Sequence, residues 1–566
     1  MVAWLTIALL LSHLPAVADS AVAAGQRCEE ALAASCGSQR GNPFECTTCA
    51  GEHATALQHA GCDNDDIAFW CSGECPSGYV IRNQCVPTGV SPLQFYVDLP
   101  DPSYRYEGPI QQFPLPGATA YVLNMTSQTW LSDDIFKTYS PVKSTWWHQL
   151  TVVVPTKLDP KLTTGWLWIT GGGNSNHSKQ VDPEDQEVAV AAALAVATKT
   201  IGAVLNQIPN QPTAFAVDIP HDPHMYPREL REEDGIIAYT WNHFVYKQPH
   251  MPEFLLRMPM TKAVVRAMDT VIDYANTAHG SSLERFVVGG ASKRGWTTWT
   301  TGVVDKRCAA LVPVVMDLLN LAENTAHSFE SLGGWTFAYA DYTNAAMVGP
   351  ITQSPEFQSL ASIVDPYSYL STKQGYPSPW PATHFERVPK LVVDGGNDEF
   401  FLPDDNHIWW GDMPGEKHLL HIPNADHPLS FLPANESTGV EVFSASLLAF
   451  YSAVVQERPR PTFDWSISAD GLAITVGNFS VAPKTVSVWH ATTSDGFRDF
   501  RLYNCRGALP GHNCTSAEHG APGGPAPHVV KYTESPAASI GHNSWEGRVP
   551  PPPTGSYFSY SFAERS

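Results

Sequence analysis

The sequence predicts an α/β fold with a mostly parallel sheet, and two features of the chain carry this prediction. From Gln149 onward, short apolar runs alternate with segments of helical length. Several runs are hydrophobic without interruption, which is typical of strands covered by helices on both faces. The predicted strands are 150–154, 166–169, 203–208, 286–288, 311–315, 391–393 and 418–422, and the predicted helices are 184–199 and 259–277.

The N-terminus predicts export. Within residues 1–24, the apolar run Leu5–Leu11 precedes the small-x-small sequence Ala16-Val17-Ala18, as in a secretory signal peptide, although no Lys or Arg precedes the run. Ser12 and Pro15 interrupt the run too early for a membrane span. We therefore expect a secreted, extracellular protein with no membrane span. Five Asn-x-Ser/Thr sequons are compatible with glycosylation: Asn124, Asn176, Asn435, Asn478 and Asn513.

Composition restricts the class of partner. The chain has 566 residues, of which 43% are hydrophobic, so it can form a large core and more than one domain. The formal net charge is −22, from 56 acidic and 34 basic residues. A strongly acidic protein is repelled by phosphate backbones and by anionic membrane surfaces. We therefore expect no nucleic-acid partner.

Residues 25–90 predict a separate cysteine-rich module. Eight of the eleven cysteines lie between Cys28 and Cys85, with too few large apolar residues for a core of their own. The alternative to disulfides is a zinc site that contains Cys46-x-x-Cys49, but export and the even count favour disulfides. A Pro-rich linker, 85–106, is predicted to separate the module from the main body. The module is a candidate surface for a cell-surface partner.

The main body, 91–456, is the predicted α/β domain, and it is followed by a predicted β-sandwich-like domain, 457–566. An aromatic-rich insertion, 318–389, interrupts the α/β pattern and is predicted to form a cap over the site. The last segment shows alternating apolar and polar residues, which is typical of half-buried strands. A disulfide between Cys505 and Cys514 is expected there, and Cys308 is expected to be a buried thiol.

The segment Phe286–Trp299 predicts a nucleophile elbow. An apolar strand enters Gly289-Gly290, Ser292 stands at the apex, and an amphipathic stretch follows. The spacing is Gly290-x-Ser292-x-x-Gly295 rather than G-x-S-x-G, with Arg294 where the second glycine usually stands. Arg294 is a candidate contact for an anionic group of the substrate.

Two later residues could activate this serine. Asp398 and His427 each follow a predicted strand, so the chain order is Ser292, Asp398, His427, as in the α/β-hydrolase triad. The imidazole would accept the serine proton, and the carboxylate would orient the imidazole and stabilise its charged form. Asp317, at the end of an earlier strand, is the alternative acid.

Backbone N–H groups are predicted to form the oxyanion hole. One donor is Lys293, directly after the serine, and the others are Gly172 and Gly173 in the Gly171–Asn174 loop after an early strand. No cofactor and no metal ion are expected. The sequence His221-Asp-Pro-His224 has the residue types of a metal site, but its proline and acidic neighbours fit a surface loop better.

Several long motifs resemble those of the PhoPQ-activated pathogenicity-related family: VLNQIPNQP, the Arg231–Trp241 run, PMTKAVVRAMD, GGASKRGW and VSVWHATTSDGFRDFR. The likeness covers roughly 95–562. The family includes bacterial secreted proteins and an amoebal autocrine proliferation repressor. The resemblance implies an α/β-hydrolase fold with a β-rich C-terminal region, and it carries the triad roles onto Ser292, Asp398 and His427. The Ser-x-x-Gly elbow is also similar to that of glucuronoyl esterases.

The sequence thus predicts a secreted serine hydrolase that acts through an acyl-enzyme. Its substrate is expected to be a small-molecule ester or a peptide. The alternative is a secreted, non-enzymatic signalling factor that keeps the hydrolase fold.

Overall fold

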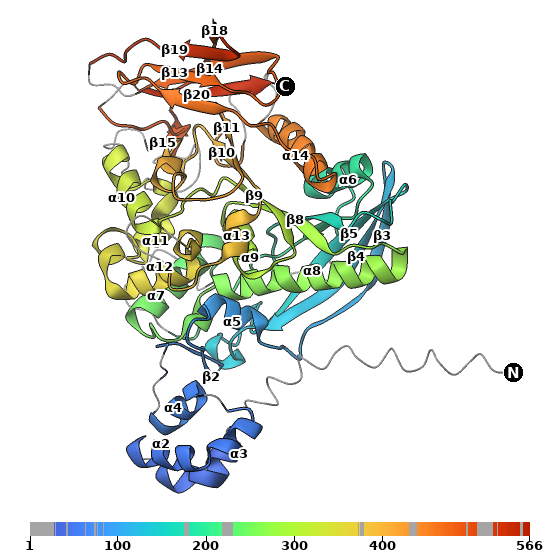
Figure 1. Cartoon of the computed structure of the whole chain (residues 1–566), viewed down its shortest axis with the longest axis vertical. Helices are drawn as coiled ribbons and strands as arrows, with labels where there is room; N and C mark the ends of the chain where they lie inside the picture. Colours follow the sequence, from blue (N-terminus) through green and yellow to red (C-terminus); the bar gives the residue numbers. More distant parts are fainter. Residues whose placement is uncertain are drawn as a thin grey trace, which may run out of the picture.

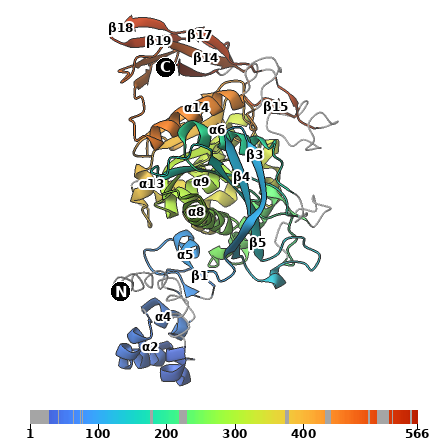
Figure 2. The same cartoon turned by 90° about the vertical axis from the view of Figure 1, so that its right-hand side faces the viewer.

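The computed structural model describes residues 28–565 except 29, 41–42, 63, 73–74, 76, 83, 175–179, 218–229, 372, 374–377, 430–438, 494–495, 506–523, 529 and 555–557. The predicted signal peptide and the HDPH sequence lie outside the described residues. Figures 1 and 2 show a central sheet with helices on both faces, a small helical module at one end of the long axis, and a β-rich domain at the other.

One nine-stranded sheet forms the centre of the molecule. Its strands are β3 (Arg105–Leu115), β4 (Ala118–Thr129), β5 (Thr145–Pro155), β6 (Thr164–Ile169), β7 (Gly202–Leu205), β8 (Arg285–Ala291), β9 (Cys308–Val314), β10 (Lys390–Gly395) and β11 (Lys417–Ile422). Their order is β11-β10-β9-β8-β6-β7-β5-β4-β3. Pairing is parallel from β11 to β7 and antiparallel from β7 to β3. The predicted mostly parallel sheet is confirmed.

Helices cover both faces because successive strand residues point to opposite sides. Val287 of β8 belongs to the core on one side, and Val288 belongs to the core on the other. The covering helices are α6 (Gln186–Thr198) and α14 (Gly439–Val455) on the first side, and α8 (Arg257–His279) and α9 (Lys293–Val304) on the second. All seven strands and both helices that the sequence predicts are present.

The prediction of a linker at 85–106 is wrong. The segment contains α5 (Pro92–Asp98), which begins with a Ser91 cap: the serine hydroxyl accepts the Gln94 N–H at 3.0 Å, and proline occupies the first helical position. Leu93 and Tyr96 of this helix are buried in the main core. Prolines in this segment therefore start a packed helix instead of marking an extended connection.

The cysteine-rich module is held by four disulfides, as predicted: Cys28–Cys62, Cys36–Cys49, Cys46–Cys71 and Cys75–Cys85. The module contains α2 (Pro43–Glu52), α3 (Ala54–His59), α4 (Asn64–Ser72) and a hairpin of β1 (Val80–Ile81) and β2 (Gln84–Cys85). The Cys46–Cys71 disulfide joins α2 to α4, and Cys75–Cys85 joins β2 to the segment after α4. Most side chains of the module's small core are cysteines. The zinc alternative is wrong, because all eight sulfurs are bonded to one another.

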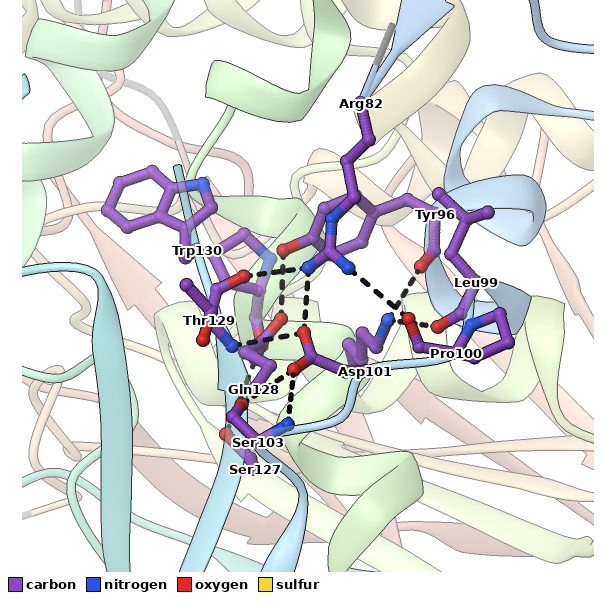
Figure 3. A network of polar contacts seen from close by, with 12 residues as sticks. Arg82, Tyr96, Leu99, Pro100, Asp101, Ser103, Ser127, Gln128, Thr129 and Trp130 are labelled. Atoms are coloured by element: carbon purple, nitrogen blue, oxygen red, sulfur yellow. Dashed lines mark hydrogen bonds and ion pairs between the residues drawn. The ribbon is translucent and has the colours of Figure 1, made fainter. Parts of the chain in front are cut away.

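Arg82, at the turn of that hairpin, joins the module to the main body (Figure 3). Its guanidinium donates to Asp101 Oδ2 at 2.7 Å and to the carbonyl of Thr129, the last residue of β4, also at 2.7 Å. The Arg82 N–H donates to the Glu253 carboxylate at 2.9 Å. Charge-assisted contacts of this kind are stronger than neutral ones, so the hairpin is fixed to the end of β4.

The C-terminal region contains two packed antiparallel sheets, which confirms the sandwich-like prediction. One sheet has the order β12 (Asp464–Ile467), β13 (Ala473–Gly477), β19 (Ser544–Arg548), β18 (Ala538–Gly541), and the other β17 (Thr533–Pro536), β14 (Thr485–Thr492), β20 (Phe558–Arg565). A Cβ built at Gly547 would lie 2.7 Å from Val488 Cβ, so glycine permits the close approach of the sheets. Cys505 is disulfide-bonded, and its predicted partner Cys514 lies outside the described residues. Cys308 is a buried free thiol, as predicted.

The predicted cap is a helical segment between β9 and β10. Its helices include α10 (Leu321–Leu332), α11 (Ala340–Asn344), α12 (Pro355–Val364) and α13 (Thr383–Arg387). Among helices in the described part of the chain, none combines the length and hydrophobicity that a membrane span requires.

Candidate active site

Ser292 lies on a sharp turn between β8 and α9. Its φ is 56° and its ψ is −127°, a conformation that costs a non-glycine residue about 1–3 kcal/mol and must be held by its surroundings. The Ser292 N–H donates to the carbonyl of Val314, on the neighbouring strand β9, at 2.8 Å. This strand–turn–helix geometry is that of a nucleophile elbow, which presents the serine hydroxyl at the carboxyl edge of the sheet.

The displaced glycine of this elbow has a packing reason. A Cβ built at Gly295 would lie 2.8 Å from Met316 Cβ and 3.0 Å from the Val314 carbonyl oxygen. A Cβ built at Gly290 would lie 2.8 Å from the Arg294 carbonyl oxygen. Contacts this short are essentially absent from real structures, so both positions require glycine. Arg294 can therefore stand inside the motif because Gly295, one residue later, carries the close approach of α9 to the sheet.

The structure brings Asp398 and His427 together. They follow β10 and β11, and Nδ1 of His427 lies 2.7 Å from Oδ2 of Asp398. The other carboxylate oxygen accepts the N–H groups of Phe400 and Phe401 at 2.6 and 3.1 Å. Asp398 is only 2% exposed, so its carboxylate is held in one orientation. A carboxylate on Nδ1 leaves Nε2 as the proton acceptor of the imidazole.

Asp317, the alternative acid, is buried after β9 and has a different environment. Its Oδ1 has no hydrogen-bond partner among the described residues. Burial, together with the carboxylates of Asp394, Asp405 and Asp398, raises the pKa of Asp317 well above its usual range. The His427 imidazole is hydrogen-bonded to Asp398, and a carboxyl group with a raised pKa is the weaker partner for an imidazolium. The geometry therefore favours Asp398 over Asp317 as the partner of the histidine.

Ser292 and His427 have two neighbouring residues in common, Phe400 and Phe401. The Phe400 ring lies 4.4 Å from the His427 ring, centroid to centroid, and Phe400 and Phe401 line a cavity together with Ser292. Ser292 and His427 both belong to the described part of the chain. In this structure the His427 imidazole is hydrogen-bonded to Asp398 and not to the Ser292 hydroxyl. Catalytic hydrogen bonds are often long before a substrate is bound and shorten in the complex.

The glycine-rich loop lies beside the elbow, because β6 and β8 are neighbouring strands with Ile169 opposite Gly290. Gly172 has a φ of 115°, which favours glycine, and both Gly172 and Gly173 are exposed. Asn174 closes the loop. Its N–H donates to the Gln211 carbonyl at 2.7 Å, and its side-chain amide donates to Asn210 at 3.1 Å.

The third predicted oxyanion donor, the N–H of Lys293, is the first of α9. The Ser292 side chain does not cap this helix, so the positive end of the helix dipole faces the region of the serine hydroxyl. The three donor positions Gly172, Gly173 and Lys293 therefore lie at one edge of the sheet.

Three charged residues that the sequence analysis did not identify brace the elbow. Nζ of Lys293 forms ion pairs with Glu233 and Asp234, both at 2.9 Å. Arg257, which is fully buried, donates to the Lys293 carbonyl at 2.8 Å and to the Thr297 hydroxyl at 2.7 Å. These contacts fix the first turn of α9. For Glu233 and Asp234, the signal in the sequence is an acidic pair at the start of α7 (Glu233–Tyr246), a helix with no other acidic residue.

The Arg294 guanidinium contacts other groups of the protein, and the expected contact with an anionic group of the substrate stays a prediction. Its guanidinium donates to the Glu233 carboxylate at 2.6 Å and to the Ile208 carbonyl at 2.5 Å. A Cβ at Gly171 would lie 2.5 Å from one of its nitrogens. Arg294 thus joins the elbow to the glycine-rich loop and to α7.

A small, mostly apolar cavity of about 40 Å³ adjoins Ser292. Residues of the cap form much of its wall. Its lining residues are Asp234, Trp241, Ser292, Lys293, Trp296, Met316, Leu318, Leu321, Thr325, Tyr339, Tyr342, Met347, Val348, Phe357, Phe400 and Phe401. Two tyrosines of the aromatic-rich insertion, Tyr339 and Tyr342, therefore line the cavity.

Glu399 predicts a pH dependence of stability. One oxygen of the Glu399 carboxyl group accepts the backbone N–H of His427 at 3.2 Å. Burial, and to a smaller extent the charge of Asp398, raise the pKa of Glu399 to about 8. The folded state holds this proton more tightly than the unfolded chain does. Its stabilising contribution is therefore complete below the ordinary carboxyl pKa and is lost as the pH rises towards 8.

Glu399→Gln removes this ionisation, so we expect the variant to be more stable than the wild type at pH 9 by about 2–4 kcal/mol and no more stable at pH 4. Urea unfolding at both pH values measures the difference. Glu457→Gln, at an exposed glutamate, is the control and should leave the pH dependence unchanged. Equal stability of Glu399→Gln and wild type at pH 9 would contradict the argument.

The sequence profile of the PhoPQ-activated pathogenicity-related proteins matches residues 93–501 of this chain. The chain belongs to this family. Within the family match, the segments quoted from the sequence surround the elbow: the Arg231–Trp241 run supplies Glu233 and Asp234, and VLNQIPNQP supplies the residues that hold Asn174. A curated relative, autocrine proliferation repressor protein A of Dictyostelium discoideum, is 35% identical over 426 residues, which are 73% of this chain and 77% of the relative.

Solved structures similar to this family member include two acetyl xylan esterases. That of Paenibacillus sp. R4 has a TM-score of 0.39 at 12% identity, covering 64% of this chain and 92% of the esterase. That of Thermoanaerobacterium sp. JW/SL YS485 has a TM-score of 0.39 at 12% identity, covering 64% and 96%. An S-formylglutathione hydrolase from Agrobacterium tumefaciens has a TM-score of 0.33 at 12% identity, covering 62% and 98%.

Proposed function

We propose that this protein is an exported serine esterase whose triad is Ser292, His427 and Asp398. The observation that carries the proposal is the buried Asp398–His427 hydrogen bond of 2.7 Å, at the same sheet edge as a serine on a strand–turn–helix elbow. Export is supported by the four disulfides, which persist in oxidising compartments, and by the signal-like sequence 1–24.

The proposed reaction is acyl transfer to the serine followed by hydrolysis. His427 Nε2 accepts the Ser292 proton as Oγ attacks the ester carbonyl, and Asp398 stabilises the resulting imidazolium. The N–H of Lys293 and those of Gly172 and Gly173 donate to the developing oxyanion. The imidazolium then protonates the leaving alcohol, and water attacks the acyl-enzyme with His427 again as the base.

The cavity restricts the acyl group. A cavity needs roughly 10–15 Å³ to hold one group of the size of a water molecule. The cavity beside Ser292, of about 40 Å³, therefore holds about two to four such groups, which corresponds to an acyl chain of about two to four carbons. Its wall is aromatic and aliphatic apart from four polar residues, and the two charged ones, Lys293 and Asp234, are paired with each other. A charged acyl group would therefore lose its hydration without gaining a free counter-charge. We therefore expect short, uncharged acyl esters to react faster than long-chain or acidic ones.

A fluorophosphonate probe tests the proposal. The purified wild-type chain should be labelled at Ser292, as located by peptide mass spectrometry, and labelling should stop the hydrolysis of p-nitrophenyl acetate in parallel. The p-nitrophenyl esters of acetate, butanoate and octanoate test the acyl preference. A native, folded chain that is neither labelled nor hydrolytic would contradict the proposal.

The relative's name gives a second candidate, a secreted repressor of proliferation that acts without catalysis. In that case, the chain would act on cells through its surface, for example through the cysteine-rich module. Treating cells with the wild-type and the Ser292→Ala chain separates the two candidates: equal growth inhibition would favour the signalling function.

A further inference from the structure

Three potential metal ligands meet outside the candidate active site. His327 lies on α10, within the cap, and Asp404 and His407 lie at η7 (Asp405–Ile408), shortly after Asp398. One ring nitrogen of each histidine and one Asp404 oxygen all lie within 4.8 Å of one another. His327 Nε2 is 3.2 Å from Asp404 Oδ1, and the two imidazole rings are 4.8 Å apart.

The hydrogen bonds of this group are suited to metal binding. Nδ1 of His407 lies 2.5 Å from the Asp404 carbonyl oxygen. When Nδ1 carries the proton and donates it there, Nε2 keeps the lone pair that a metal ion requires. Histidine ligands of metal ions usually have such a partner on the other nitrogen, often a backbone carbonyl.

A buried carboxylate beside the group provides an independent observation. Asp405 is 1% exposed, and its Oδ1 has no hydrogen-bond partner among the described residues. This oxygen lies 4.0 Å from His327 Nε2. Its other oxygen accepts the Leu402 N–H at 2.9 Å, so the carboxylate is held with Oδ1 towards the histidine. An unpaired buried carboxylate oxygen is costly, and a cation would satisfy it.

Arg498 occupies one side of the group without closing it. Its guanidinium contacts Oδ2 of Asp404, which leaves Oδ1 towards His327. A cavity of about 310 Å³ is lined by His327 of this group, together with Glu330, Ser331, Gly496 and Arg498. His327 is therefore accessible to a hydrated ion from solvent. Asp404 has one carboxylate oxygen for the Arg498 guanidinium and the other for a metal ion.

We propose that His327, Asp404 and His407, with Asp405 in support, bind a Zn²⁺-type transition-metal ion that clamps the cap to the loop carrying Asp398. Two imidazoles with a carboxylate are a common ligand set for zinc, and three protein ligands leave one position for water. Mg²⁺ and Ca²⁺ prefer oxygen ligands, so they should compete poorly. The expectation from the sequence, that no metal site is present, would then be wrong.

Zinc titration of the EDTA-treated, full-length chain tests the site. Calorimetry should show one tight Zn²⁺ site per chain, and Co²⁺ bound in its place should give a visible absorption spectrum. Because losing even an outer partner of a ligand weakens metal binding about 10–100-fold, His327→Ala and His407→Ala should each weaken it by about 100-fold or more. Zn²⁺ should also raise the melting temperature of the wild type but not of these variants.

His418→Ala is the matched control. His418 is likewise bonded to a carboxylate, that of Glu416 at 2.9 Å, but lies outside the group, so the variant should bind Zn²⁺ as the wild type does. His407 is exposed, so its variant should fold even where His327→Ala does not. A wild-type chain that binds no Zn²⁺, or a His407→Ala chain that binds it as tightly as wild type, would overturn the proposal.

Discussion

Replacing Ser292 by alanine is expected to lower kcat/KM for p-nitrophenyl acetate by at least about 10⁴-fold, since removal of a triad serine eliminates the covalent route. KM should change little, because the cavity walls remain. Fluorophosphonate labelling should disappear completely. Stopped-flow or steady-state kinetics with the purified variant measures the loss.

The fold of this variant should be intact. Alanine and serine pay a similar cost for a positive φ, and the N–H of residue 292 can still donate to Val314. Ser444→Ala, in α14 and away from the cavity, is the control for the loss of a hydroxyl, and it should keep full activity. If Ser292→Ala retained more than about a hundredth of the wild-type rate, the serine would not be the nucleophile.

Replacing Asp398 by asparagine is expected to lower kcat by about 10³–10⁴-fold. The amide cannot stabilise an imidazolium by charge, and its N–H₂ group can turn towards Nδ1 and favour the wrong tautomer. The size of the side chain and the contacts of the loop remain, so binding of the substrate should be nearly unchanged. The dependence of kcat on pH should shift along with its magnitude, because the histidine loses its partner.

Asp317→Asn is the comparison that decides between the two acids. Asp317 is buried, and burial together with neighbouring carboxylates raises its pKa, so a neutral amide should be tolerated there better than at Asp398, which is bonded to the histidine. We expect its kcat to stay within about tenfold of wild type. A larger loss in Asp317→Asn than in Asp398→Asn would transfer the role of the acid to Asp317.

Much of the site could be predicted from the sequence because each of its parts directly follows an apolar strand. The runs before Ser292 and Asp398 are continuous and hydrophobic, whereas the run before His427, the edge strand β11, contains Lys417, His418 and His421 and is only partly buried. Parallel strands bring the carboxyl ends of all three to one edge. Burial on both faces therefore leaves a clear local pattern. The same pattern predicted the seven strands from β5 to β11.

The first two strands of the central sheet, β3 and β4, were not predicted from such a pattern. β3 lies at the edge of the sheet and is mostly exposed, with prolines at 109 and 114, so its residues are not selected for burial. The sequence predicts a linker at 85–106 for a similar reason. The prolines are visible in the local composition, and they favour a linker. The burial of Leu93 and Tyr96 depends instead on α8, which is far away in the chain.

The sequence by itself determined the α/β sheet, the disulfide-rich module and the order of the candidate catalytic residues, because hydrophobic periodicity and residue spacing are local properties. Only the tertiary structure decided which charges meet. Lys293 pairs with Glu233, 60 residues earlier, and His327 lies beside Asp404, 77 residues later. Such pairs depend on how helices pack on the sheet, and no local pattern in the chain encodes that separation.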